Sequence, residues 1–377
     1  MNNLLVGNGI NIQFNKKDYT TQQLVLRILK NCDREDFPSH IIVNFPYLLK
    51  NYIGQLFLEA RDILEDKYDS YTNCFAEVES LKSFKKRYKD KINILRITDI
   101  GFEDYYLIHD LVCHKTNTQN PKQYYIREAM RIAYLYAIYN DGKINTLYQE
   151  YPRKFIDYLI EFDNIFTTNY DLNVELATQK QVYHIHGQFD KKSDVYLLNS
   201  FRNQLPDAPI KEIEIDENYF YLYSNALTTH SGAYKELQIK QISQANSVVE
   251  KMAMAYNNDP KIKQEVDSWT IEANKLTANM GYAIQLKAVN PSLTFSDNYH
   301  FDIFKNITGT LQILGLSPWN DFHIFESVNA SDIDKCVYYY FDESECDKIK
   351  ELLPELNVQG KLEFLSVKAF WENCYEK

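Results

Sequence analysis

Residues 166–171 read Phe-Thr-Thr-Asn-Tyr-Asp, and residues 183–187 read Tyr-His-Ile-His-Gly. The first stretch ends a short buried strand predicted over 164–168, and its Asp171 can cap the helix that follows. The second stretch predicts another short strand, which ends on a His-Gly pair. Two strands that deliver polar side chains at their carboxyl ends describe the ligand crevice of an open parallel α/β sheet. We therefore predict a binding site at this edge of the sheet.

Strands from both ends of the chain lead to the same edge. An apolar strand over 3–6 runs into Gly-Asn-Gly-Ile-Asn at 7–11, and a strand over 311–314 ends at Gly-Leu-Ser, residues 315–317. Closely spaced glycines let backbone N–H groups approach a phosphate, because no Cβ stands in the way. A Gly-x-Gly pair alone is a weak signal, since the third glycine of the dinucleotide fingerprint is missing. Combined with the Thr-Thr-Asn and His-Gly segments, it becomes more specific.

These segments resemble, in the same order, the motifs of the sirtuin NAD-binding fold. Residues 7–11 are similar to its Gly-Ala-Gly loop, 167–171 to its Thr-Gln-Asn-Ile-Asp segment, His186 to its catalytic histidine and 315–317 to its late Gly-Thr-Ser loop. The form Thr-Thr-Asn-Tyr-Asp most resembles the sirtuin-like NAD hydrolases of bacterial anti-phage, or abortive-infection, defence. The resemblance implies an α/β fold, a Rossmann-like parallel sheet of the sirtuin type with large inserted helical regions.

The resemblance also implies roles for individual residues. Asn169 matches the sirtuin asparagine that holds a ribose hydroxyl or orients water, and His186 matches the histidine that takes a proton near neutral pH. Asp171 would support the ribose or brace its loop. We expect the dinucleotide to contact Gly7, Asn8, Gly9, Ile10, Asn11, Thr168, Gly315 and Ser317.

The differences from the sirtuin pattern favour water, rather than an acyl-lysine substrate, as the acceptor of the ADP-ribose group. Thr168 replaces the sirtuin glutamine, and Asn8 and Asn11 replace the alanine and the serine-type residue of the glycine loop. The six cysteines are scattered without Cys-x-x-Cys spacing, so the zinc module of deacylating sirtuins has no counterpart. We therefore expect an NAD(+) hydrolase that releases nicotinamide and ADP-ribose. We expect no zinc and no cofactor beyond NAD(+), which is the substrate.

The resemblance further implies a toxic, NAD-depleting effector whose activity is gated. We expect a homo-oligomer, with a phage component or a companion defence protein as regulator, for example a HerA-type ATPase or another co-encoded subunit. One alternative is a catalytically silent module that senses NAD or ADP-ribose in a defence complex. Another is a protein deacylase or ADP-ribosyltransferase. A nucleic-acid-processing protein is a weaker third reading.

Composition bears on partners and location. The chain has 377 residues and a formal net charge of −11. Sequence-independent binding to nucleic acid needs a basic surface, so this acidic charge disfavours it. The first strand begins at once, without a signal peptide, and no apolar run reaches the length of a membrane span. We therefore expect a cytoplasmic bacterial protein without membrane or direct nucleic-acid contact.

The predicted elements divide the chain. A sirtuin-like core takes residues 1–37, 151–200 and 300–377, an inserted helical subdomain takes 38–150, and a second helical region, a candidate for oligomerisation or regulation, takes 201–299. The patterns predict helices over 19–30, 45–64, 124–139, 152–160, 234–256, 261–280, 321–328 and 343–353. They predict further strands over 195–198, 337–341 and 362–367.

Two other histidines deserve a prediction. His184 lies two residues before His186, so on a strand both side chains would share a face. We favour a packed histidine over a supporting catalytic role for His184. His323 has no motif around it, and we expect it to be structural or exposed.

Overall fold

The computed structural model describes residues 1–15, 18–41, 46–120, 122–206, 214–228, 233–272, 274–295 and 299–375. The chain forms two compact units. The first consists of Met1–Gln188, Ala226–Glu236 and Tyr299–Lys377, and the second consists of Phe189–Asn225 and Leu237–Asn298. The described helices include none that is both long and apolar enough to cross a membrane.

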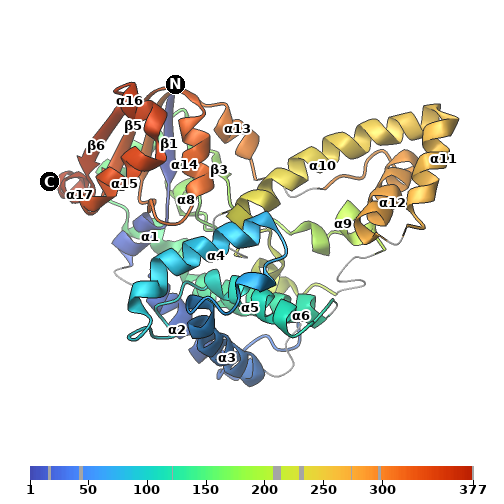
Figure 1. Ribbon diagram of the computed structural model, residues 1–377. Coiled ribbons are helices and arrows are strands. Elements are labelled where there is room, and N and C mark those ends of the chain that lie inside the picture. Colours follow the sequence, from blue (N-terminus) through green and yellow to red (C-terminus); the bar gives the residue numbers. More distant parts are fainter. Residues whose placement is uncertain are drawn as a thin grey trace. The chain divides into compact units, whose positions relative to one another are not determined.

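The first unit is built on a six-stranded sheet, drawn in the upper part of Figure 1. All its strands are parallel, in the order β3-β2-β1-β4-β5-β6. They are β1 (Asn2–Val6), β2 (Asn164–Thr167), β3 (Val182–His184), β4 (Thr308–Leu314), β5 (Asp332–Tyr340) and β6 (Leu362–Ser366). The predicted α/β class with a Rossmann-like parallel sheet is thereby confirmed. This strand order is characteristic of doubly wound dinucleotide-binding sheets.

Strand β1 lies at the centre of the sheet, which explains its apolar sequence. Leu4, Leu5 and Val6 are fully buried. Leu5 is paired with Phe166 of β2 on one side and with Ile313 of β4 on the other. A parallel strand covered on both faces reads as a continuous hydrophobic run, as this one does.

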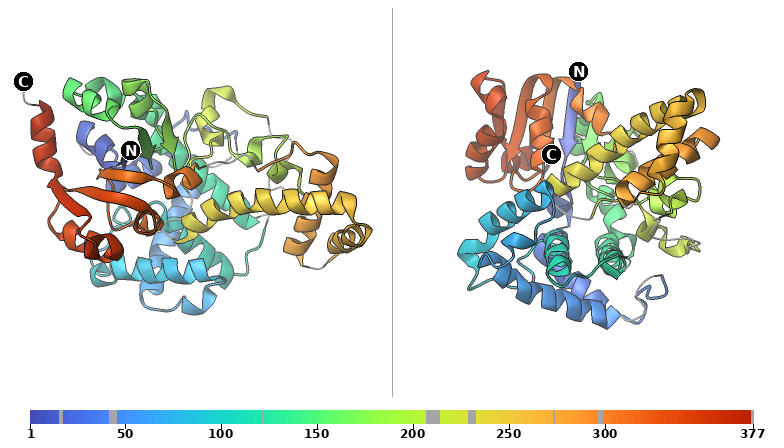
Figure 2. Two further views of the ribbon diagram at one scale, coloured as in Figure 1. Left: turned by 90° about the horizontal axis from the view of Figure 1, so that it is seen from above. Right: turned by 45° about the vertical axis from the view of Figure 1, so that its right-hand side comes forward.

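Helices cover both faces of the sheet, as the views in Figures 1 and 2 show. On one face, Leu4, Ile165 and Val337 pack in one core with Phe155 and Trp371. The helices of this face are α1 (Gly9–Phe14), α7 (Arg153–Ile160), α8 (Asn173–Thr178) and α17 (Val367–Tyr375). The helices of the other face are α13 (Phe301–Lys305), α14 (Phe322–Asn329), α15 (Ser344–Leu352) and α16 (Pro354–Val358).

A block of helices belongs to the same unit and lies on the side of the carboxyl ends of the strands (Figure 1). It comprises α2 (Thr21–Asn31), α3 (Pro46–Leu64), α4 (Phe75–Tyr88), α5 (Asp104–Lys115) and α6 (Lys122–Tyr139). The helices predicted over 19–30, 45–64 and 124–139 are confirmed. Helix α6 ends where predicted, because Asn140, Asp141 and Gly142 take φ of 50°, 56° and 80°.

The second unit is largely helical among its described residues. It contains α9 (Phe201–Gln204), most of α10 (Ala233–Asn258), α11 (Pro260–Trp269) and α12 (Lys275–Val289). Phe201, Val249 and Leu293 form part of its core. The unit begins at Phe189, and residues 226–236 return to the first unit.

Two predicted elements of this unit are wrong. The strand predicted over 195–198 is a 3-10 turn, Asp194–Tyr196, because the N–H groups of Tyr196 and Leu197 bond three residues back instead of to a neighbouring strand. The single helix predicted over 261–280 is broken between α11 and α12.

The break lets α11 and α12 pack on each other. Helix α11 ends at Trp269, whose carbonyl accepts a hydrogen bond from the Glu272 N–H, and α12 starts at Lys275. Val266 of α11 and Ile284 of α12 are then fully buried in one cluster. One straight helix could not bury both residues against each other.

Candidate functional site

A pocket of about 410 Å³ opens in the first unit beside the carboxyl ends of the central strands. Its volume lies within the range of small-molecule sites, roughly 300–1,000 Å³. Between β1 and β4 the strand order reverses, which is where open α/β sheets bind ligands. The loops after β1, β2, β3 and β4 contribute Asn8, Thr168, Asn169, Tyr170, Asp171, His186, Asn320 and Asp321, and helix α1 contributes Asn11. Helical segments add Arg87, Glu103 and Lys235 among others.

The glycine loop after β1 packs directly on the loop after β4. The Gly7 N–H donates to the Leu314 carbonyl at 2.9 Å, and the Gly9 N–H donates to the Gly315 carbonyl at 2.8 Å. A Cβ on Gly9 would lie 2.6 Å from the Gly315 Cα. The Ile10 N–H is also used, since it donates to the Gly7 carbonyl at 3.2 Å. Close contact between two loops therefore accounts for the glycines here.

Only some of the residues predicted to contact the dinucleotide line the pocket. Asn8, Asn11 and Thr168 line the pocket. Ile10 is buried in the core beneath the sheet, and Ser317 is exposed, with its Oγ accepting the Trp319 N–H at 3.4 Å. Gly7, Gly9 and Gly315 shape the loops behind the pocket rather than its lining.

Asn169 is held by its backbone and directs its side chain to the pocket. Its N–H donates to Thr167 Oγ1 at 3.0 Å, and its carbonyl pairs with His184 Nδ1 at 2.8 Å. The carboxamide Nδ2 reaches the Gly7 carbonyl at 3.4 Å. Among the described residues Oδ1 has no hydrogen-bond partner. A ligand in the pocket can therefore use this oxygen.

Asp171 is a buried brace between two helices. Its Oδ2 accepts from Asn11 Nδ2 at 2.7 Å, which connects it to α1. Its Oδ1 accepts from the N–H of Asn173 at 3.1 Å and from Asn173 Nδ2 at 2.6 Å. The N–H of Asn173 is the first of α8, so the Asp171 carboxylate binds the start of this helix, although the N-cap position itself is Leu172 rather than the predicted Asp171. Burial raises the pKa of Asp171, and these hydrogen bonds oppose the rise.

His184 is a packed histidine, as favoured above. Both ring nitrogens are engaged, Nδ1 with the Asn169 carbonyl and Nε2 with Glu175 Oε1 at 2.5 Å. Burial lowers the pKa of His184, but the hydrogen bond and the charge of Glu175 together with the Asn169 carbonyl and the charge of Asp171 outweigh it, so the pKa is raised. Strand β3 ends at His184, so His186 lies beyond it. The two side chains therefore meet different partners, and the expectation of a shared strand face is wrong.

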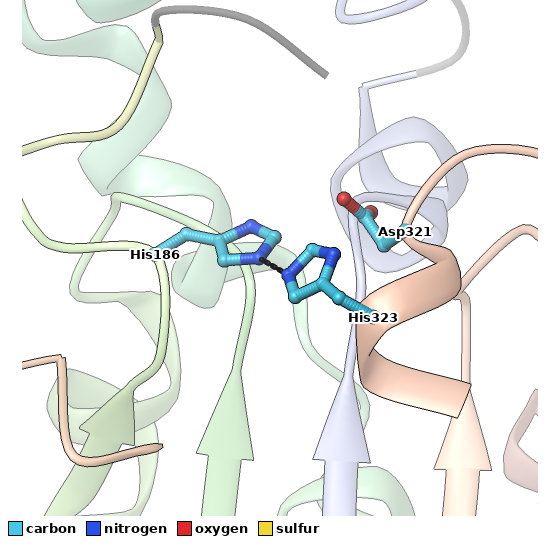
Figure 3. Close-up of side chains that lie close together, drawn as sticks. All are labelled: His186, Asp321 and His323. Atoms are coloured by element: carbon cyan, nitrogen blue, oxygen red, sulfur yellow. Dashed lines mark hydrogen bonds between the residues drawn. The ribbon is translucent and has the colours of Figure 1, made fainter. Parts of the chain in front are cut away.

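His186 faces a second histidine across the site (Figure 3). Its Nε2 lies 3.0 Å from His323 Nε2, and the two rings stack with centroids 5.2 Å apart. Both side chains are almost completely buried. Burial lowers the pKa of His186 well below its ordinary value, and the charge of Lys235 and the neighbouring His323 act in the same direction. These effects all favour the neutral form of the His186 imidazole.

Four charged or titratable residues beside the pocket were missed by the sequence reasoning: Glu103, Lys235, Asp321 and His323. Lys235 is 2% exposed and pairs with Glu103 at 2.6 Å. Burial raises the pKa of Glu103 to about 7, although Lys235 opposes the rise. Asp321 and His323 follow β4, so the carboxyl-end rule applied to the other strands could have found them. No sequence pattern marks Lys235.

No family model, no curated protein and no solved structure matches this chain. The resemblance to sirtuins therefore stays a prediction, and the site has to be argued from its own geometry.

Proposed function

We propose that this protein is an NAD(+) hydrolase that cleaves the bond between nicotinamide and ribose. The observation that carries the proposal is the position of the pocket. It opens where the strand order of a 3-2-1-4-5-6 sheet reverses, and Asn169 and His186 both line it. The sirtuin resemblance supplies the substrate.

The proposed reaction needs few protein groups. Water attacks the anomeric carbon of the ribose as nicotinamide leaves, and the water gives up a proton. The Asn169 carboxamide would hold a ribose hydroxyl or orient the water, since Asn169 lines the pocket and its Oδ1 has no hydrogen-bond partner among the described residues. His186, neutral and buried, would accept the proton. Asp171 would act indirectly, by fixing the loop that carries Asn169.

The biological role is proposed on the resemblance alone. It is a gated, NAD-depleting effector of anti-phage defence, with a homo-oligomer and a companion protein or phage trigger as the regulatory elements. The second helical region, residues 201–299, is the candidate regulatory part.

The test is nicotinamide release from NAD(+), followed by chromatography. We expect Asn169→Ala and His186→Ala each to lower turnover at least about 100-fold. Asn164→Ala is the matched control, because Asn164 lies at the opposite end of β2 and bonds to Asn3. His114→Ala serves the same purpose for histidine, since His114 bonds to the Tyr71 carbonyl. Both controls should keep turnover within about threefold.

Two results would contradict the proposal. One is wild-type turnover that both site variants retain. The other is an NAD level that stays constant in phage-infected cells while the protein still protects them. NAD binding without cleavage under those conditions would instead indicate the sensing module.

A further inference from the structure

His186, Asp321 and His323 form a side-chain cluster at the pocket, and the proposed hydrolase reaction uses only His186 of the three. His186 comes from the loop after β3, and Asp321 and His323 come from the start of α14 (Figure 3). One ligand atom of each lies within 4.8 Å of the others. The two histidines present Nε2 to each other at 3.0 Å.

The third group, the side chain of Asp321, does not cap helix α14, although it stands at the position where a cap is usual. Asp321 precedes the first residue of α14, where a side-chain oxygen commonly caps the helix, yet its carboxylate makes no such bond. Among the described residues the Asp321 carboxylate accepts no hydrogen bond, although its backbone carbonyl accepts the Ile324 N–H at 3.0 Å. Burial raises the pKa of Asp321. Figure 3 shows the carboxylate turned to the side where the two rings meet.

We propose that His186, Asp321 and His323 bind one divalent transition-metal ion, Zn²⁺, and that the bound ion inhibits the enzyme. Two imidazole nitrogens and one carboxylate oxygen are a donor set that suits zinc, with a fourth position left open. Because His186 and Asp321 line the pocket, that position faces its interior. The inhibition rests on the proposed hydrolase function, whereas the binding does not.

The geometry needs only small adjustments to hold the ion. Zinc-to-nitrogen bonds of about 2.0–2.1 Å in a tetrahedron place ligand atoms roughly 3.3 Å apart. The two Nε2 atoms, now 3.0 Å apart, would separate by a few tenths of an ångström, and the Asp321 oxygen would move inward. The nearby cation Lys235 is paired with Glu103, so the Asp321 carboxyl group is not held by an ion pair with it and can serve as an oxygen donor to the metal.

Bound zinc would inhibit the enzyme because the metal and the proton compete for the same lone pair of His186. The Nε2 of His186 can either accept a proton or coordinate the metal. Occupation by zinc therefore removes the proposed base.

The binding test uses the full chain after removal of metals with a chelator. Zn²⁺ is titrated by calorimetry, and Co²⁺ is titrated as a coloured substitute followed by visible absorption. We expect one ion per chain, and a tetrahedral Co²⁺ spectrum. His323→Ala and Asp321→Ala should each weaken binding by more than the roughly 10–100-fold typical of residues behind a metal ligand. The control His114→Ala should bind as the wild type does, and Mg²⁺, which prefers oxygen ligands, should not compete.

The outcomes separate the two proposals. Absence of Zn²⁺ and Co²⁺ binding, or binding that both ligand variants retain, would overturn the metal site and leave a hydrogen-bonded histidine pair. Binding by a protein that never cleaves NAD(+) would keep the site and count against the hydrolase. Turnover that is unchanged or raised at saturating Zn²⁺ would overturn the inhibition.

Discussion

The substitution Gly9→Ala tests whether Gly9 is needed for close packing against the loop after β4 or for binding a phosphate of the dinucleotide. The added Cβ would meet the Gly315 Cα at 2.6 Å and the Gly315 carbonyl oxygen at 2.9 Å, both backbone atoms. Ordinary contact between carbon atoms requires about 3.5–4.0 Å, so one loop must move by roughly 1 Å. Such a movement breaks the hydrogen bond from the Gly9 N–H to Gly315, which is now 2.8 Å long.

The magnitude follows from these two effects. Loss of one buried hydrogen bond costs about 0.5–1.5 kcal/mol, and overpacking costs about 1–3 kcal/mol. We expect the free energy of unfolding to fall by about 2–4 kcal/mol. At roughly 2 °C per kcal/mol for a large domain, Tm should drop by about 4–8 °C.

Thermal unfolding monitored by circular dichroism provides the assay, together with NAD(+) binding by calorimetry. Gly54→Ala is the matched control, since Gly54 lies inside α3 with no atom near its added Cβ. It should stabilise the protein by roughly 0.5–1 kcal/mol, because alanine favours the helix. An unchanged Tm for Gly9→Ala with loss of NAD(+) binding would refute the packing argument and restore a phosphate-binding role.

Further predictions concern the residues around the site. Asp171→Ala should lower the free energy of unfolding by about 2–4 kcal/mol in urea titrations, because it leaves Asn11 and a helix N–H without their acceptor. Glu175→Gln should lower the pKa of His184, measured by NMR, since the carboxylate that raises it is gone. Turnover should stay constant between pH 8 and about pH 6.5, because the pKa of His186 lies well below its ordinary value; a midpoint near 6.5 would contradict this. The same shift predicts that His186 lowers stability as the pH falls below about 6.5, where the unfolded chain binds the proton first, so that Tm of wild type should decline there more than that of His186→Gln.

The strands of the sheet could be predicted because each contains a short run of apolar residues that is visible in the local sequence. The buried strands are short apolar runs that stop at polar residues or glycine, so 3–6, 164–168 and 311–314 were placed to within a few residues. Strand β5 starts earlier than predicted, at Asp332, since Asp332, Asp334 and Lys335 near its start are charged and exposed. Apolar runs mark burial, and an exposed strand end lacks that mark.

The site was predictable only in part. The meeting of Asn169 and His186 follows from the rule that parallel strands end at one edge. His323 could not be placed, because its partner lies 137 residues away and nothing local connects them. The packing role of Gly9 requires knowing that β1 and β4 are neighbours, and a linear sequence does not contain that information directly.

The central position of β1 has a consequence for how the protein is made. The ribosome produces this strand first, yet its partner β2 follows about 160 residues later and β4 about 300 residues later. At roughly 5–20 residues per second, β1 waits on the order of 15–60 s before both neighbours exist. During that time Leu4, Leu5 and Val6 are uncovered and can be held by a chaperone. The pocket also draws on Asp321, so an unfinished chain has no complete site.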